Sequence, residues 1–283
     1  MVKILECVME PEPKKPARIL AIAGSDSGGG AGIQADIKTI TTLGGYAMTA
    51  LTALTAQNTQ GVQAILPVPP EFLRAQIRSV LDDLGADAIK TGMLGGAAEI
   101  QCVCEEITRY RKLAPTLPVV IDPVMIAKGG ASLLAQEALS CLKTQLFPLA
   151  TLLTPNLPEA EKLTGMTISS VEDMRKAASV LRQISGATVL VKGGHLTCDG
   201  LVDVLLDADG FTEFSDTRIA TRHTHGTGCT LASALAVGLA QKLPLRRAVE
   251  MARLYVRQAI LTAPGLGAGA GPLWHAHDWY ESF

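Results

Sequence analysis

Short apolar runs alternate with helix-length amphipathic segments along most of this 283-residue chain. The apolar runs predict strands at residues 18–23, 88–90, 119–121, 151–154 and 188–191. The segments between them predict helices at 33–43, 70–84, 97–112, 133–145, 157–164 and 171–185. Strands that alternate with helices favour a mainly parallel sheet covered on both faces. The sequence therefore predicts a doubly wound α/β fold.

The remaining segments complete one predicted domain. A strand is expected at 48–54, with 56–59 as its exit loop, and a hairpin at 201–206 and 211–214 around Asp209-Gly210. Helices at 229–241 and 245–262 end the core. No linker divides residues 18–283, which we expect to form a single domain behind a mobile tail at residues 1–17.

Composition excludes several function classes. The net charge is −2 and aromatic residues make up 4%, which argues against a nucleic-acid partner. No apolar run approaches the roughly 20 residues of a membrane span, and no signal peptide is evident. The six cysteines show no metal-ligand spacing, so a reducing compartment, the cytoplasm, is expected.

The segment 225–230, His-Gly-Thr-Gly-Cys-Thr, places glycines and a thiol directly before a predicted helix. Such a turn leaves backbone N–H groups free at the positive end of the helix dipole, which suits a phosphate group. A thiol in the first helical turn is expected to have a lowered pKa. Cys229 could then act as a base beside a bound phosphate, although a lone cysteine is more often a small buried residue.

Other polar residues follow the predicted strands, where α/β proteins bind ligands. Lys192-Gly193-Gly194 could hold a nucleotide polyphosphate, yet the chain lacks a P-loop. Asn156 and Glu159 suit Mg²⁺ held through water, or a helix capping box, and taken alone the cap is favoured. Asp122 could be structural or assist the metal. The cluster at residues 28–32 is either a substrate-covering turn or an ordinary strand-to-helix loop.

Together these motifs resemble the ribokinase-like superfamily, and within it the hydroxymethylpyrimidine/phosphomethylpyrimidine kinases of thiamine biosynthesis. The resemblance covers about residues 18–278 and rests on residues 23–36, 52–59, 90–94, 154–160, 191–195 and 225–230. Within these, Gly-Ala-Gly-Ile-Gln-Ala-Asp and Ala-Gln-Asn-Thr are specific to this branch. The resemblance implies a ribokinase-like fold and an ATP- and Mg²⁺-dependent kinase that phosphorylates the pyrimidine alcohol and then its monophosphate.

The resemblance also implies a role for each matching residue. The pyrimidine pocket would be lined by Gly24, Ala31, Asp36, Gln57 and Met93.

At the nucleotide side, Lys192, Thr227 and Gly228 would bind the ATP phosphates. Asn156 would also lie at the ATP site. Together with Glu159 and Asp122, it would organise Mg²⁺ and its waters. Cys229 would be the base, and the amides from Gly226 to Cys229, those of Gly226 and Gly228 included, would stabilise the transferring phosphoryl group.

Two alternatives stay open: a pyridoxine/pyridoxal kinase of the same superfamily, and a relative that binds ligands without catalysis. The resemblance further implies a homodimer whose ligands are the small-molecule pyrimidine and ATP. One departure is that Gly265–Pro272, the glycine-rich tail, lacks the lysine that some relatives carry.

Overall fold

The structure is a computed structural model that describes residues 15–125, 136–196 and 200–277. The predicted tail falls almost entirely on residues 1–14, which lie outside the described ranges. Within those ranges, none of the helices combines the length and the apolar character that a membrane crossing needs.

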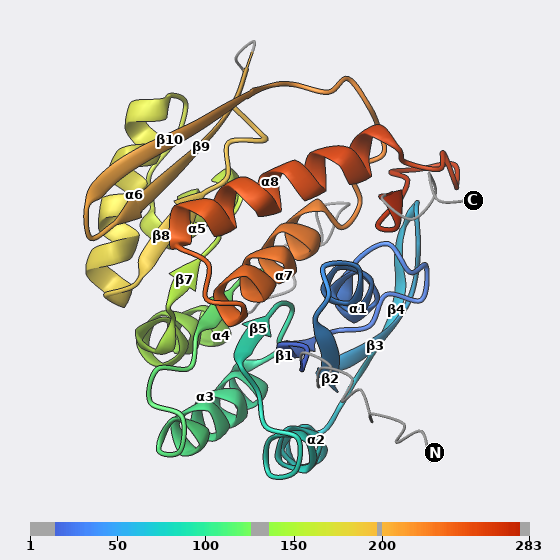
Figure 1. The fold of residues 1–283 in the computed structure, drawn as a ribbon, viewed down its shortest axis with the longest axis vertical. Coiled ribbons are helices and arrows are strands. Elements are labelled where there is room, and N and C mark those ends of the chain that lie inside the picture. The colour runs from blue at the N-terminus through green and yellow to red at the C-terminus, as the bar shows by residue number, and fades with distance from the viewer. Residues whose placement is uncertain (1–14, 126–135, 197–199, 278–283) are drawn as a thin grey trace, which may run out of the picture.

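An eight-stranded sheet runs through the molecule in the order β10-β9-β8-β7-β6-β5-β1-β2 (Figure 1). Six strands are parallel and the last two, β9 and β10, join antiparallel. The strands are β1 (Arg18–Ala23), β2 (Tyr46–Leu51), β5 (Ala88–Thr91), β6 (Val119–Ile121), β7 (Leu152–Leu153), β8 (Thr188–Val191), β9 (Gly200–Asp207) and β10 (Gly210–Thr217). The predicted fold class and the hairpin at its edge are confirmed.

Helices cover both faces because side chains of each strand alternate between them. Ile19 and Ala21 of β1 pack toward one face, while Leu20 and Ile22 pack toward the other. The first face carries α1 (Gly32–Thr42), α7 (Thr227–Ala240) and α8 (Leu245–Leu261). The second carries α2 (Pro70–Leu81), α3 (Ala97–Arg111), α4 (Gln136–Cys141), α5 (Leu157–Thr164) and α6 (Val171–Ser185) (Figure 1).

Two local predictions were wrong. The predicted strand at 48–54 is divided between β2 and β3 (Ala53–Asn58), and the predicted loop at 56–59 belongs mostly to β3. β3 pairs antiparallel with β4 (Gly61–Pro67), which was not predicted, in a separate two-stranded sheet. After the buried Ala53, the side chains of β3 alternate between exposed and half-buried, so polar Gln57 and Asn58 fit a half-covered ribbon.

The predicted helix at 133–145 is also different. Residues 133–135 lie outside the described ranges, and α4 changes at Leu142–Leu146 into a π-helix and then into a 3-10 turn at Phe147–Leu149. Pro148 lies in that turn, and its ring cannot continue an α-helix.

Candidate active site

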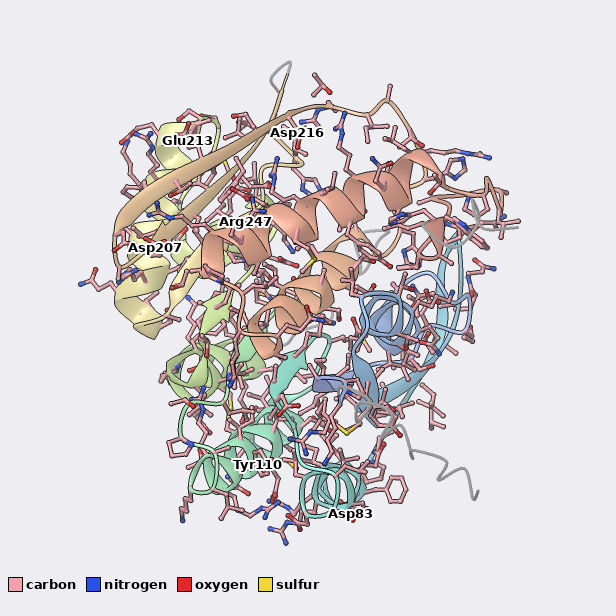
Figure 2. The ribbon with its side chains drawn as sticks, in the orientation of Figure 1. Asp83, Tyr110, Asp207, Glu213, Asp216 and Arg247 are labelled. Atoms are coloured by element: carbon pink, nitrogen blue, oxygen red, sulfur yellow. The ribbon has the colours of Figure 1, made fainter. Side chains whose placement is uncertain are left out.

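A cavity of about 670 Å³ opens at the carboxyl ends of the parallel strands. Every predicted site residue except Asp36 lines it: Gly24, Ala31, Gln57, Met93, Asp122, Asn156, Glu159, Lys192, Gly226, Thr227, Gly228 and Cys229. The position agrees with the rule that α/β sheets bind ligands at this edge. The cavity also extends over Asp216 of β10, which pairs with Arg253 of α8 at 3.1 Å, and Figure 2 labels this aspartate beside that helix.

The turn before α7 begins at Gly226, which has a φ of +86°. A Cβ atom there would lie 1.8 Å from the Gly30 carbonyl oxygen, so only glycine fits. Thr227 is fixed by its hydroxyl, which donates to the Thr224 carbonyl at 2.8 Å. The N–H groups of Gly228 and Cys229 lie in the first helical turn, where the helix itself offers no acceptor.

Asp26 connects this turn to the first glycine cluster. Its carboxylate accepts hydrogen bonds from the N–H groups of Gly28, Gly30 and Ala31 at 2.8 to 3.1 Å. It also contacts His225 Nε2 at 2.8 Å. Burial opposes ionisation, but these donors outweigh it and lower the pKa of Asp26. Asp26 is not among the site residues predicted from the sequence, although its position two residues before a glycine run is typical of a carboxylate that holds a turn.

Gln57 reaches the same point from β3. Its Nε2 lies 3.4 Å from His225 Nε2, and its backbone N–H donates to the Ser27 hydroxyl oxygen at 2.8 Å. Elsewhere in the cavity wall, the Met93 methyl group fills the space beside Gly24, where a Cβ atom would approach it to 2.3 Å. The two predicted pyrimidine-binding side chains, Gln57 and Met93, therefore line one cavity.

Lys192 and Asp122 lie beside the turn. Lys192 Nζ donates to Asp122 Oδ1 at 2.9 Å, and a Cβ atom on Gly228 would lie 3.3 Å from that nitrogen. Burial works against the charged lysine, but the carboxylates of Asp122 and Glu159 raise its pKa. Lys192 therefore keeps its positive charge beside the turn that precedes α7.

Asn156 and Glu159 form the predicted capping box at the start of α5. Asn156 Oδ1 accepts from the Glu159 N–H at 2.9 Å, and Glu159 Oε2 accepts from the Asn156 N–H at 2.8 Å. Burial raises the pKa of Glu159 to about 7, helped by the nearby Asp122. Among the described residues no group of three or more His, Cys, Asp or Glu side chains could hold a metal ion.

Two predictions about this site were wrong. Asp36 does not line the cavity: its side chain is fully buried and pairs with Lys90 Nζ at 2.8 Å. The pKa of Cys229 is not lowered in the free protein, because burial raises it to about 11 despite its place at the start of α7. The helix terminus and neighbouring cations do not overcome the loss of hydration.

Comparisons with known proteins decide the family. The family model described as phosphomethylpyrimidine kinase matches residues 26–274. The chain belongs to this family. It is 49% identical over 259 residues to the hydroxymethylpyrimidine/phosphomethylpyrimidine kinase of Bacillus subtilis, covering 91% of this chain and 94% of that one.

A second relative is the thiamine biosynthesis bifunctional protein ThiED of Geobacter sulfurreducens. It is 52% identical over 257 residues, which are 91% of this chain and 52% of that protein, so this chain spans about half of its length. Among solved structures, an ADP complex of Bacillus subtilis pyridoxal kinase superposes with a TM-score of 0.86 at 38% identity, covering 94% of this chain and 99% of that one. The ribokinase-like fold predicted from the motifs is confirmed.

Replacing Gly226 by Ala should displace the turn, because the added Cβ atom would overlap the Gly30 carbonyl. A shift of about 1 Å at a reacting centre can cost about 100-fold in rate. We expect such a loss in kcat, measured by ADP release, without loss of the folded state in circular dichroism. Gly200→Ala is the control, since its Cβ atom would meet only ordinary contacts at 3.7 Å. Equal kcat values in both variants would refute the steric account.

Glu159→Gln should change how stability depends on pH. The pKa of Glu159 rises from 4.5 to about 7 on folding, so the wild type loses stability as the pH rises from about 5 to 8. Glutamine keeps the capping bond but carries no charge to bury. In Mg²⁺-free urea titrations, we expect wild type to lose about 2–3 kcal/mol relative to the variant across this range. Parallel curves for the two proteins would contradict the assignment.

Proposed function

We propose that this protein transfers the γ-phosphoryl group of ATP to 4-amino-5-hydroxymethyl-2-methylpyrimidine and then to the resulting monophosphate, in thiamine biosynthesis. The main support for this proposal is that Gln57, Lys192 and the turn with Cys229 all line one cavity. Family membership and the name of the Bacillus subtilis relative support this substrate.

The pyrimidine would occupy the part of the cavity near Gln57. A glutamine amide can donate and accept hydrogen bonds at the edge of an aminopyrimidine. Gly24 and Ala31 would lie close to the ring, and Met93 would cover its apolar part. The absence of a side chain at Gly24 leaves room for the Met93 methyl group, so these two residues set the shape of the pocket together.

The ATP phosphates would lie against the turn and Lys192. The first-turn N–H groups of α7, together with the positive end of its dipole, are suited to an anion. Lys192 would add a full charge, which Asp122 now holds in place at 2.9 Å. Positioning and charge neutralisation supply most of the catalysis in phosphoryl transfer.

The residues present fit Mg²⁺ held mainly by waters and phosphates. Asp122 is buried, and Glu159, also buried, uses one carboxylate oxygen for the capping bond. When bound, the metal would neutralise charge on the phosphates. Asn156 would act mainly by fixing Glu159, because its side-chain oxygen is already engaged.

Cys229, in its thiolate form, would take the proton from the substrate hydroxyl and become a neutral thiol. The alcohol oxygen then forms a bond to the γ-phosphorus, the bond to the bridging oxygen breaks, and ADP leaves with that electron pair. In the second round the oxygen of the monophosphate attacks in the same way. Since the free thiol has a pKa of about 11, the base would need a stabilising charge nearby when the substrate is bound.

A pyridoxal kinase is the second candidate. The superposition with the Bacillus subtilis pyridoxal kinase supports it, since that structure shares nearly the whole fold. The identity to the Bacillus subtilis protein named for the pyrimidine activity is higher, at 49% against 38%, which favours the first candidate.

We further propose a homodimer that uses the edge formed by β2, β3 and β4. Large apolar side chains are exposed along it, namely Tyr46, Leu54, Ile65 and Leu66. Exposed apolar patches of this kind often mark subunit contacts. A monomer in light scattering at micromolar concentration would contradict this proposal. Cytoplasmic location and the lack of a nucleic-acid partner stay predictions from the sequence.

The test of function is ADP release with Mg²⁺-ATP and three acceptors offered separately: hydroxymethylpyrimidine, its monophosphate and pyridoxal. We expect turnover of both pyrimidines. Turnover of pyridoxal alone would transfer the assignment to the second candidate. No turnover with any acceptor would favour a non-catalytic relative.

Cys229→Ala tests the base within the same assay. Loss of a general base commonly costs about 100- to 10,000-fold in rate, and we expect a loss in this range in kcat with little change in KM for ATP. Cys141→Ala is the matched control, because that buried thiol lies on α4, away from the cavity. Unchanged turnover in Cys229→Ala would remove the assigned base.

A further inference from the structure

A fully buried ion pair lies at the junction of the sheet and two helices. Lys90, near the carboxyl end of β5, has a fully buried side chain. Its Nζ donates to both carboxylate oxygens of Asp36 on α1, at 2.8 and 2.9 Å. Ser233 on α7 donates its hydroxyl to the same carboxylate at 2.7 Å. This cluster, Lys90–Asp36–Ser233, does not line the cavity.

Such a cluster is expensive for a fold to keep. Removing two charges from water costs several kcal/mol per ion, and well-packed apolar residues often serve stability equally well. Buried charged groups with perturbed pKa values concentrate at functional sites. A functional group is therefore expected beside this cluster.

The neighbour is Cys229, and the connection runs through two packed helices. Asp36 follows Gly32 by four positions on α1, and Ser233 follows Cys229 by four positions on α7. Residues four apart share one helix face. The Gly32 N–H donates to the Cys229 sulfur, while one turn deeper the Ser233 hydroxyl donates to Asp36. The sulfur therefore lies at the N-termini of both α1 and α7.

Four charged groups face the sulfur from the surrounding elements. The cations are Lys90 of β5 and Lys192, which follows β8; the carboxylates are Asp36 of α1 and Asp122, which follows β6. Burial is the largest influence on the pKa of Cys229 and raises it, and Lys90 is the strongest opposing one. Asp36 raises this pKa, but by less than Lys90 lowers it. The net effect of the pair on the thiol is therefore that of a positive charge.

We propose that Lys90, held in place by Asp36, is a positioning residue that stabilises negative charge on the Cys229 sulfur. The second helix terminus, through the Gly32 N–H, assists it. This inference rests on the proposed role of Cys229 as base, and it gives Asp36 a different task from the pyrimidine contact predicted from the sequence. The cluster provides the positive charge that favours the thiolate form of Cys229, which is the form that can accept a proton.

The test replaces both members of the pair, because a single replacement would leave a buried charge unpaired. In the double variant Lys90→Met/Asp36→Asn, the asparagine amide oxygen can still accept the Ser233 hydrogen bond. The net charge of the protein stays the same, because one positive and one negative charge are removed. The first readout is the rate at which iodoacetamide alkylates Cys229 at pH 9, resolved by mass spectrometry of its peptide. The second is kcat and KM for the pyrimidine.

We expect alkylation of Cys229 to slow by about threefold or more. Each unit of rise in pKa removes about nine tenths of the thiolate, and a partial gain in nucleophilicity offsets some of that loss. We expect kcat to fall while KM for the pyrimidine stays within about twofold, since the cluster does not line the cavity. Glu106→Gln, which alters a buried charge on α3, should change neither readout.

An unchanged alkylation rate in a folded double variant would overturn the inference. If the double variant does not fold, Lys90→Met/Asp36→Leu/Ser233→Ala removes every polar member of the cluster and repeats the test. Alkylation also separates this inference from the proposed function. If Cys229→Ala retains turnover but alkylation still slows in the cluster variant, the base assignment fails and the role of Lys90 stands.

Discussion

The close approach of two glycine turns is the constraint on which the site depends. The turn before α7 and the loop before α1 meet where Gly226 faces the Gly30 carbonyl oxygen, at a separation that excludes any Cβ atom. Asp26 fixes the contact by accepting from the N–H groups of one loop and contacting His225 of the other turn. This contact fixes the loop before α1, where we propose the pyrimidine binds, relative to the turn before α7, where we propose the phosphates bind.

Charge is distributed across this junction in pairs. Lys192 is balanced by Asp122 near the turn, and Lys90 is balanced by Asp36 beneath it. Paired charges can remain ionised in a site that excludes water, whereas isolated ones would neutralise. Glu159 shows the cost of incomplete pairing, since burial raises its pKa to about 7. A cation that binds with the nucleotide would relieve that cost.

The sequence predicted the sheet and twelve residues that line the cavity, because both depend on local patterns. Except for β2, the parallel strands are almost entirely buried, so apolar runs in the sequence marked their positions. Glycine and polar residues at the strand ends then indicated the cavity. The β3–β4 ribbon was missed because its polar residues, such as Gln57 and Asn58, resemble those of a loop.

The remaining errors concern long-range contacts. Asp36 was assigned to the pocket because it lies in a matching motif, but its partners Lys90 and Ser233 are 54 and 197 positions away in the sequence. The pKa of Cys229 was misjudged because helix position is local, whereas burial depends on the whole fold. A lysine inside the apolar strand at 88–91 was the available signal for the buried pair.

The central claim is that one turn presents the phosphoryl group to an alcohol beside Cys229. A crystal structure with ADP, Mg²⁺, a trifluoroberyllate group and hydroxymethylpyrimidine would test it most directly. We expect the phosphoryl mimic within hydrogen-bond distance of the Gly228 and Cys229 N–H groups, and the substrate hydroxyl within reach of the Cys229 sulfur. A hydroxyl directed away from that sulfur, or a phosphoryl mimic held elsewhere in the cavity, would contradict the account.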